Sequence, residues 1–396
     1  MKICICRMGF VLCLLLPLFF TEASRPSPQS DPDLLPTVRG LSGIRFWGDL
    51  PIPKNVEPID ELAKQILSDT TYDPVCDMSF LVISGGGSRG AFGAGWLSGW
   101  SDSGTRPTFR LVTGISTGAL TAPFAFLGEA YDDVLEELYT LYSTTNILDP
   151  SHPNDNSRLR SILKKYIGQA EIQKIADEYR KGRRLVVGTT WLDVLRPVAW
   201  DLSAIAASGS SESLDTMLDV MLASAGVPGL LPPVLFESTM RGSTYGELHA
   251  DGGLAKLEFL EPIAARIGAA LSKVGHTGPT MVYILHNDRV APAVAEVKID
   301  PNAIISSALL SLFRSNGFYA LNNIFNESRI DGEIYQLTYI PASFTQRPRE
   351  VFDIHYMRAL FTLAHDTAKE GPDWQSQPPP YPALSGLQQR LMRLNM

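Results

Sequence analysis

Two glycine-containing motifs lie close together in this chain, and each follows a short apolar segment. The first is Gly85-Gly86-Gly87-Ser88-Arg89-Gly90, after residues 80–83, and the second is Gly114-Ile115-Ser116-Thr117-Gly118, after residues 109–112. A tight turn between a strand and a helix exposes a serine hydroxyl, and a glycine-rich loop exposes backbone N–H groups that can stabilise an oxyanion. The two motifs therefore predict a serine acyl hydrolase with Ser116 as its nucleophile.

The surroundings of Ser116 are more informative than the pentapeptide itself. Glycine and serine are common in loops, so a G-x-S-x-G sequence by itself indicates only a turn. Here it follows an apolar strand and precedes the small residues 119–122, which is the context of a nucleophile elbow, with Gly114 and Gly118 leaving room for the turn. The run 85–90 is then the oxyanion loop, and the helix N-terminus after it adds positive potential.

The glycine-rich run also fits the G-x-G-x-x-G pattern of dinucleotide-binding folds. Such a fold needs an acidic residue about 20 positions further on, at the end of the second strand, to bind the ribose hydroxyls. In this chain Thr113-Gly114-Ile115-Ser116 occupies that place. The serine elbow is therefore the favoured interpretation, and nucleotide binding is disfavoured.

A third motif, Asp251-Gly252-Gly253, lies far downstream of Ser116. By itself Asp-Gly-Gly is a good turn sequence. The order of the three motifs, together with the small residues 222–228 and the prolines at 232–233, resembles that of the patatin-like phospholipases over about residues 79–255. One difference is Ser84, where many members of that family have an aspartate, so the anchoring of the oxyanion loop is in question.

The resemblance implies a three-layer α/β fold with a mostly parallel central sheet flanked by helices. It also implies a Ser-Asp dyad, in which Asp251 takes the Ser116 proton under the glycine loop, and Gly252 and Gly253 complete the proton-acceptor motif. The substrate would be a lipid ester, as for a phospholipase A or a lysophospholipase-type esterase, and no cofactor is implied. A carboxylate base needs a raised affinity for protons, which burial beside the nucleophile would provide.

Two other interpretations remain open. A Ser-His-Asp triad of the α/β-hydrolase type would use a histidine later in the chain, and His286, at the end of the apolar residues 281–285, is the best placed. The other candidates are His276, His355 and His365, while His249 would share a strand face with Asp251. The second alternative is a catalytically silent binding or scaffold protein of the same fold. A metal site is not expected, because the chain has no signature zinc motif.

Alternating strand-like and helix-like segments must position these motifs. Strands are predicted at 80–83, 109–112, 184–189, 281–285 and 333–339, and helices at 91–100, 119–127, 131–142, 158–165 and 214–224. A further helix begins at 58–61, with Leu62, Ile66 and Leu67 spaced for one face. This alternation predicts a parallel sheet covered by helices. Residues 308–325 are predicted to be core, with an acyl channel or an interfacial surface as the alternative.

The two ends of the chain have their own signals. Lys2 and Arg7 precede an apolar stretch, 8–20, and a small-residue site, which predicts a secretory signal peptide cleaved after Ala23. Three of the four cysteines lie within it, so no internal disulfide is expected. Residues 25–58 form an arm that packs on the body through Phe46 and Trp47. Near the other end, a proline-rich connector at 377–382 precedes a helix with four leucines on one face, Leu384, Leu387, Leu391 and Leu394.

These signals predict the organisation and the partners of the protein. We divide the chain into a signal peptide at 1–23, an N-terminal extension at 24–76, a catalytic domain at 77–290, and a C-terminal extension at 291–396 that packs on it. The protein is expected to be periplasmic, envelope-associated or secreted. A net charge of -8 disfavours nucleic acid. The expected partner is a lipid ester, peripheral membrane contact is an open alternative, and the oligomeric state is open.

Overall fold

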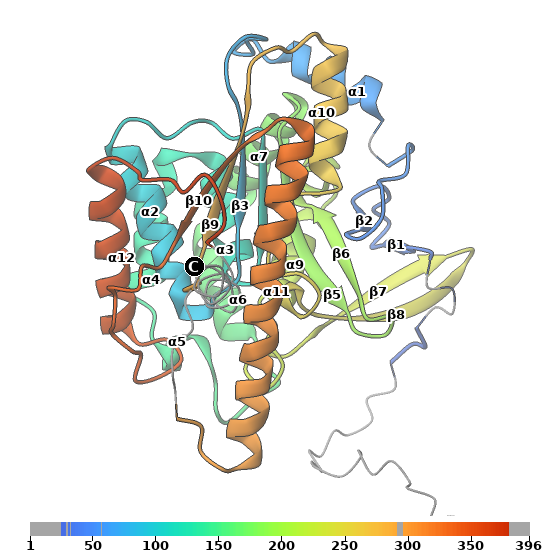
Figure 1. Ribbon diagram of the computed structural model, residues 1–396. Helices are drawn as coiled ribbons and strands as arrows, with labels where there is room; N and C mark the ends of the chain where they lie inside the picture. Colours follow the sequence, from blue (N-terminus) through green and yellow to red (C-terminus); the bar gives the residue numbers. More distant parts are fainter. Residues whose placement is uncertain (1–24, 29–30, 32, 57, 291–295, 380–396) are drawn as a thin grey trace, which may run out of the picture.

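The computed structural model describes residues 25–28, 31, 33–56, 58–290 and 296–379, which form a ten-stranded sheet with helices on both faces (Figure 1). Neighbouring strands follow the order β1-β7-β8-β5-β4-β3-β9-β10, and β6 pairs with both β5 and β2. The strands are β1 Thr37–Val38, β2 Arg45–Trp47, β3 Met78–Ile83, β4 Leu111–Ile115, β5 Arg184–Trp191, β6 Arg196–Asp201, β7 Val234–Met240, β8 Ser243–Asp251, β9 Thr280–His286 and β10 Ile334–Tyr339. The α-helices are α1 Ile59–Ser68, α2 Gly90–Asp102, α3 Thr117–Leu127, α4 Asp132–Thr140, α5 Thr144–Ile147, α6 Ser157–Tyr166, α7 Gln169–Arg180, α8 Leu202–Ala207, α9 Ser213–Ser224, α10 Ile263–Lys273, α11 Pro301–Asp331 and α12 Ile354–Lys369. Short 3-10 helices are η1 Gly87–Arg89, η2 Glu129–Tyr131 and η3 Gly252–Leu254.

The centre of the sheet is parallel. Strands β5, β4, β3, β9 and β10 lie side by side and run in one direction, while the remaining strands join antiparallel on one side. Every residue of β3, β4 and β5 is buried, as expected for parallel strands covered on both faces. The predicted three-layer α/β fold with a mostly parallel central sheet is therefore confirmed.

Successive side chains of β3 enter two different hydrophobic cores. Leu81 and Ile83 belong to the larger core, which includes residues of α2, α3, α4, α6, α7, α8, α9 and α12. Phe80 and Val82 belong to the other core, with residues of α1, α10 and α11. Because neighbouring side chains of a strand point to opposite faces, the two cores mark the two faces of the sheet. The predicted strands and helices are present, with ends shifted by a few residues.

The segments before and after the catalytic motifs contribute to the same sheet. Strand β2 pairs with β6 and brings Phe46 and Trp47 into the body, as predicted for the N-terminal arm. Strand β10 pairs with β9. The division of the chain into a catalytic domain and two extensions stays a prediction. The predicted signal peptide and the leucine-rich residues 384–394 lie outside the described residues, and Cys76 is an exposed free thiol.

Two sequence predictions about apolar residues are wrong. Leu67 is 63% exposed, because α1 packs through Leu62 and Ile66 and Leu67 lies off that face. Residues 308–325 are only partly core, since Leu321 is buried but Leu310 is 56% exposed. The reason is that all of the buried residues of α11 lie in its C-terminal half, from Gly317 onward.

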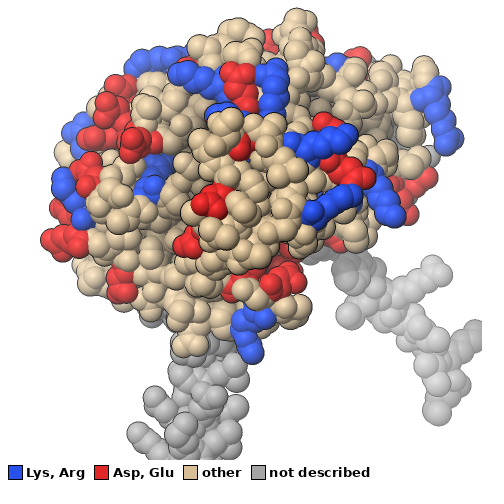
Figure 2. Space-filling model, turned by 90° about the horizontal axis from the view of Figure 1, so that it is seen from above, with Lys and Arg blue, Asp and Glu red and all other residues tan. Residues whose placement is uncertain are grey.

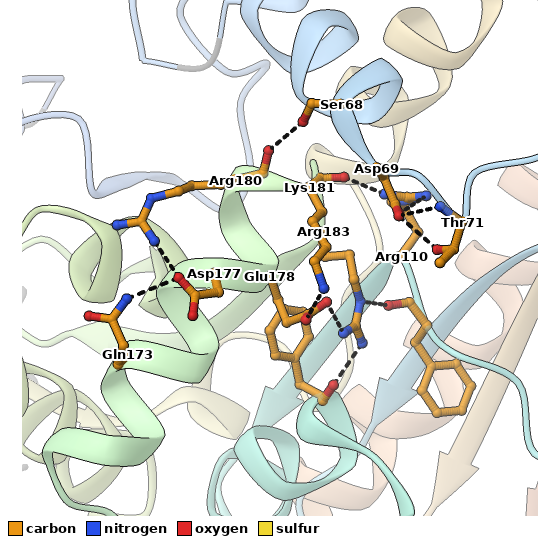
Figure 3. Close-up of polar contacts among 12 residues, drawn as sticks. Ser68, Asp69, Thr71, Arg110, Gln173, Asp177, Glu178, Arg180, Lys181 and Arg183 are labelled. Carbon is orange, nitrogen blue, oxygen red and sulfur yellow. Dashed lines mark hydrogen bonds and ion pairs between the residues drawn. The ribbon is translucent and has the colours of Figure 1, made fainter.

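A buried polar network stabilises the ends of β4 and β5 that lie opposite to the glycine motifs (Figure 3). The Arg183 guanidinium donates hydrogen bonds of 2.7 Å to the carbonyl oxygens of Phe109 and Phe126. Arg110 forms an ion pair of 3.3 Å with Asp69. These bonds tie both strands to their neighbours, so the register that positions the site at their other ends is fixed.

The charge distribution matches the modest net charge of the chain. On the face seen from above in Figure 2, Lys and Arg side chains are interspersed with Asp and Glu side chains, and the face has no broad basic area. Among the helices of the described residues, we find none with the length and apolar character that crossing a bilayer requires.

Candidate active site

Strand register brings the serine motif and the aspartate motif together. Ile115, the last residue of β4, pairs with Gly188 of β5. The next residue of β5, Thr189, pairs with Asp251, the last residue of β8. Strand β6 occupies the opposite edge of β5 along this stretch. Ser116 and Asp251 therefore leave the sheet next to each other, at the same edge of β5. This convergence of residues that are far apart in the chain is what the predicted dyad requires.

The backbone at Ser116 has the strained geometry of a nucleophile elbow. Its φ is 55° and its ψ is -123°, a conformation that residues with a side chain rarely adopt. Both flanking glycines are needed, because a Cβ would lie 2.4 Å from the Gly118 oxygen if built on Gly114, and 2.3 Å from the Ile83 oxygen if built on Gly118. The turn is fixed on both sides of Ser116, because β4 ends at Ile115 and α3 begins at Thr117, and the Ala119 N–H donates a 2.9 Å bond to the Ser116 oxygen.

A serine that sequence analysis did not assign supports the elbow. The Ser224 hydroxyl accepts a 2.9 Å hydrogen bond from the Ser116 backbone N–H and donates a 2.7 Å bond to the Gly188 oxygen. Ser224 is the last residue of α9 and is fully buried. The small-residue segment 222–228 contains the signal, because a serine among alanines at a helix end can bond backbone groups of neighbouring elements.

The Asp251 carboxylate is buried against the nucleophile. One oxygen, Oδ1, accepts a 2.7 Å hydrogen bond from the Gly253 N–H. The other oxygen, Oδ2, has no hydrogen-bond partner that meets normal distance and angle limits. The Ser116 hydroxyl lies near enough to stabilise the charged carboxylate, although the pair lacks full hydrogen-bond geometry. Oδ2 is thus the oxygen available for a proton from Ser116.

Burial changes the proton affinity of this carboxylate. It raises the pKa of Asp251 to about 7, although the Ser116 hydroxyl and the Gly253 N–H favour the charged form and lower it in part. A carboxyl group with an ordinary pKa would be a weak base at neutral pH. This raised pKa is the property that the sequence analysis required of Asp251 as the sole base.

The glycine-rich loop crosses directly over the serine. A Cβ built on Gly85 would lie 3.1 Å from the Ser116 Cβ and 2.8 Å from Leu257 Cδ1, so a side chain there would crowd the serine and displace Leu257. Gly87 has a φ of 58°, in the left-handed region that favours glycine. Among the described residues, no acceptor bonds the N–H groups of Gly86 and Gly87. These two groups are therefore free to bind an oxyanion beside Ser116.

Ser84 and Asn287 anchor the oxyanion loop. The Ser84 hydroxyl accepts a 2.7 Å bond from the Asn287 N–H and donates a 2.8 Å bond to the Gly85 oxygen. The Asn287 amide in turn donates to the Ser84 oxygen at 2.9 Å and accepts from the Gly93 N–H at 2.9 Å. A serine at position 84 therefore holds the loop without the aspartate that its family pattern would place there.

The other residues of the loop and the turn have structural contacts. Arg89 forms a 3.3 Å ion pair with Asp288 and donates to the Asn287 oxygen, so it braces the loop. Ser88 is buried within η1. The remaining glycines lie close to neighbouring atoms and leave little room for a side chain. A Cβ built on Gly90 would lie 2.3 Å from Thr117 Oγ1, one on Gly252 would lie 2.4 Å from the Gly188 oxygen, and one on Gly253 would lie 3.0 Å from Asp251 Oδ1.

The histidines proposed for an alternative triad lie elsewhere. His286, at the end of β9, hydrogen-bonds to the buried Glu258 through Nδ1. Burial lowers the pKa of His286, but the charge and hydrogen bond of Glu258 outweigh burial and raise it overall. His249 shares hydrogen bonds of 2.9 Å with Thr189 and 3.3 Å with Glu247. No hydrogen bond of a described histidine reaches Ser116.

A comparison with protein families matches the part of the chain that contains the three motifs. Residues 81–257 match the model of the patatin-like phospholipase family. One similar solved structure is VipD from Legionella pneumophila, with 13% sequence identity and a TM-score of 0.36, over 74% of this chain and 66% of that one. The chain therefore spans just under two thirds of the length of that structure. No curated protein matches the sequence.

Proposed function

We propose that the protein is a lipid acyl hydrolase, of the phospholipase A or lysophospholipase type, with Ser116 as nucleophile and Asp251 as its only base. The observation that carries the proposal is the buried Asp251 carboxyl group, which lies against the Ser116 hydroxyl, has a pKa raised to about 7 and has an Oδ2 without a hydrogen-bond partner. The family match supports a lipid substrate at the level of the class. We also propose that the protein is exported, on the basis of its N-terminal sequence.

The reaction would proceed in two halves. Ser116 Oγ attacks the ester carbonyl carbon as its proton passes to Asp251 Oδ2, and the N–H groups of Gly86 and Gly87 bind the oxyanion. The leaving alcohol takes the proton from Asp251, and the acyl-enzyme remains. Water then attacks the acyl carbonyl and transfers a proton to Asp251, after which that proton returns to Ser116 as the fatty acid leaves.

An apolar cavity beside the elbow supports an acyl substrate. It has a cavity volume of about 50 Å³ and borders Gly87 of the oxyanion loop and Thr117 of the elbow. Its walls come from α3, α4, α6 and α12 and are mainly aliphatic and aromatic. An acyl chain attached to Ser116 would find apolar surface here, whereas a polar substituent would lose hydrogen bonds to water.

The experiment is ester hydrolysis by purified protein with two single variants. Ser116→Ala and Asp251→Asn should each lower kcat for a lipid ester by about a thousandfold or more, because each removes a group that reacts. A fluorophosphonate probe should label the wild type and leave Ser116→Ala unlabelled. The exposed Ser151→Ala and Asp133→Asn serve as matched controls and should keep full activity.

Other outcomes would select a different function. Loss of activity in His286→Gln with activity retained in Asp251→Asn would favour the histidine triad. Glutamine is chosen because it can still hydrogen-bond the buried Glu258. Absence of probe labelling and of hydrolysis across phospholipids, lysophospholipids and short esters would favour a silent scaffold.

A further inference from the structure

The N-terminal part of α11 exposes apolar side chains on a helix without charge. Residues 301–313, which we name the α11 apolar segment, contain no Asp, Glu, Lys or Arg. Ile304, Ile305, Leu310 and Leu312 are each between 51% and 61% exposed. No residue of α11 before Gly317 is buried. Water therefore contacts an apolar surface on a helix whose buried residues all lie from Gly317 onward.

This segment ends beside the proton-acceptor motif. The Asn316 side chain donates hydrogen bonds of 3.1 Å and 3.3 Å to the carbonyl oxygens of Gly253 and Leu254. A Cβ on Gly253 would lie 3.3 Å from Phe313 Cδ1, at the end of the segment. A Cβ on Gly317 would lie 2.7 Å from Leu257, so α11 lies tightly against the site at this point.

Beyond this contact the helix extends away from the body. Figure 1 shows α11 as the long orange helix whose lower half reaches below the strands. Asp300 caps the N-terminus of α11 by accepting a 3.0 Å hydrogen bond from the Ala303 N–H, so the helix has a regular N-cap at the end that lies away from the core. At about 1.5 Å per residue, the thirteen residues of the segment span roughly 20 Å.

We propose that the α11 apolar segment binds the surface of a lipid bilayer, with Ile304, Ile305 and Leu312, which lie within about 100° of one another around the helix, inserted among the acyl chains. The choice of a bilayer rests on the proposed function, because the segment is continuous with a site for lipid esters. The segment is too short to span a bilayer and lies along its interface. An inserted lipid ester would then be adjacent to Gly253 and the site.

The charge of the segment determines which bilayer it fits. Helices that bind anionic lipids carry Lys or Arg on their polar face. The α11 apolar segment has neither, and its polar residues are mainly serines, while the whole chain has a net charge of -8. Adsorption therefore comes from apolar contact, and binding to zwitterionic phosphatidylcholine should be at least as strong as binding to a membrane with anionic lipid.

The test is cosedimentation with phosphatidylcholine vesicles, using the Ser116→Ala background so that no lipid is consumed. Adding Ile305→Gln and Leu312→Gln, which lie on one face of the helix, should weaken vesicle binding about tenfold or more. The matched control is Leu67→Gln with Ile330→Gln, which are 63% and 83% exposed outside the segment and should change binding less than about twofold. All these proteins share one N-terminus, so any contribution of residues 1–23 cancels.

Turnover separates this inference from the proposed function. With Ser116 intact, the segment variant should keep its kcat/KM for a soluble short-chain ester and lose it for vesicle phospholipid. If no ester is cleaved but the segment variant still loses vesicle binding, the proposed function falls and the bilayer contact stands. Three results would each overturn the inference. The first is equal vesicle binding by the segment variant and the control variant, and the second is binding to anionic vesicles only. The third is no vesicle binding by a wild type that is a dimer and that becomes monomeric in the segment variant.

Discussion

The carboxyl group of Asp251 determines the pH dependence expected of this protein. Because burial raises its pKa to about 7, it is largely protonated in mildly acidic solution and cannot accept the Ser116 proton there. We predict that kcat/KM for a soluble ester rises with pH with a midpoint near 7, the pKa of Asp251. A profile that is flat from about pH 5 to pH 8 would contradict this assignment.

The raised pKa of Asp251 makes the predicted activity rise with pH, but it makes the folding stability fall as pH rises. The folded protein holds the Asp251 proton up to about pH 7, whereas in the unfolded chain the carboxyl group loses it near its ordinary pKa of 3.8. The contribution of Asp251 to the free energy of unfolding therefore declines as pH rises between these values. Above pH 7, Asp251→Asn should be more stable than the wild type by a few kcal/mol, at about 1.4 kcal/mol for each pKa unit. Urea titrations at pH 5 and pH 8 would measure the difference.

Some residues of the candidate site could be predicted from the sequence and others could not. Ser116, Asp251 and the glycines follow from local chemistry, because a sharp turn and an exposed oxyanion loop require these residue types. Ser224 and Asn287 were missed, since their roles consist of hydrogen bonds to residues far away in the chain. His286 is the opposite case. Its position at a strand end suggested a catalytic role, but in the structure it is hydrogen-bonded to Glu258.

Helices α3, α4, α6 and α12 enclose the cavity beside the elbow, so they should determine acyl-chain length. Ile162 of α6 lines this cavity and is partly exposed at it. Ile162→Trp should fill the space and lower kcat/KM for a dodecanoyl ester relative to a butanoyl ester by about tenfold, because an apolar pocket discriminates by the volume it offers. The measurement is the ratio of the two rate constants.

A substitution to tryptophan at another surface position provides the control for Ile162→Trp. Leu195 is 79% exposed in the turn between β5 and β6, away from the cavity, and Leu195→Trp should leave the ratio unchanged. An unchanged ratio in Ile162→Trp would show that the acyl chain does not enter this cavity.

Elements also differ in how well the sequence predicts them. The parallel strands were recognised because each is a short apolar run buried on both faces. Helix α11 was misjudged, because its apolar residues have the same composition as core. Only its position, with the C-terminal half packed on the sheet and the other half beyond it, shows that residues 304–312 are exposed.

At the scale of the whole molecule, the N-terminal arm is tied to the strand that ends in Asp251. Arg45 of β2 pairs with Glu247 of β8 through bonds of 2.5 Å and 2.9 Å, and both side chains are buried. Burial alone would raise the pKa of Glu247, but Arg45 and His249 outweigh it and lower the pKa to about 2. The arm therefore belongs to the folding unit that forms the site.

We predict that Arg45→Met lowers the free energy of unfolding by about 3–5 kcal/mol at pH 7, because it leaves a buried charge unpaired. The folded pKa of Glu247 lies below its ordinary value of 4.5, so the stabilisation is complete above that pH and declines as pH falls toward 2. The loss in Arg45→Met should accordingly shrink in acid. Urea unfolding measures it.

Two variants test the physical reason for this loss. Arg45→Met combined with Glu247→Leu should recover most of the stability, since no buried charge then remains. The exposed ion pair of Lys273 with Asp60 is the matched comparison, and Lys273→Met should cost less than about 1 kcal/mol. A large loss in the double variant would point to packing and not to charge.

The sequence by itself determined the chemistry of this protein: which hydroxyl is exposed on a turn, which loop can bind an oxyanion, and which carboxyl group follows in the third motif. These properties are local, because a turn or an apolar strand depends on residues that are neighbours in the chain. Only the tertiary structure decided that Ser116 and Asp251 meet at one edge of β5, that Asp251 is buried so that its pKa rises, and that the apolar residues of one half of α11 remain exposed. Those properties depend on strand register and packing between distant segments, which local spacing does not specify.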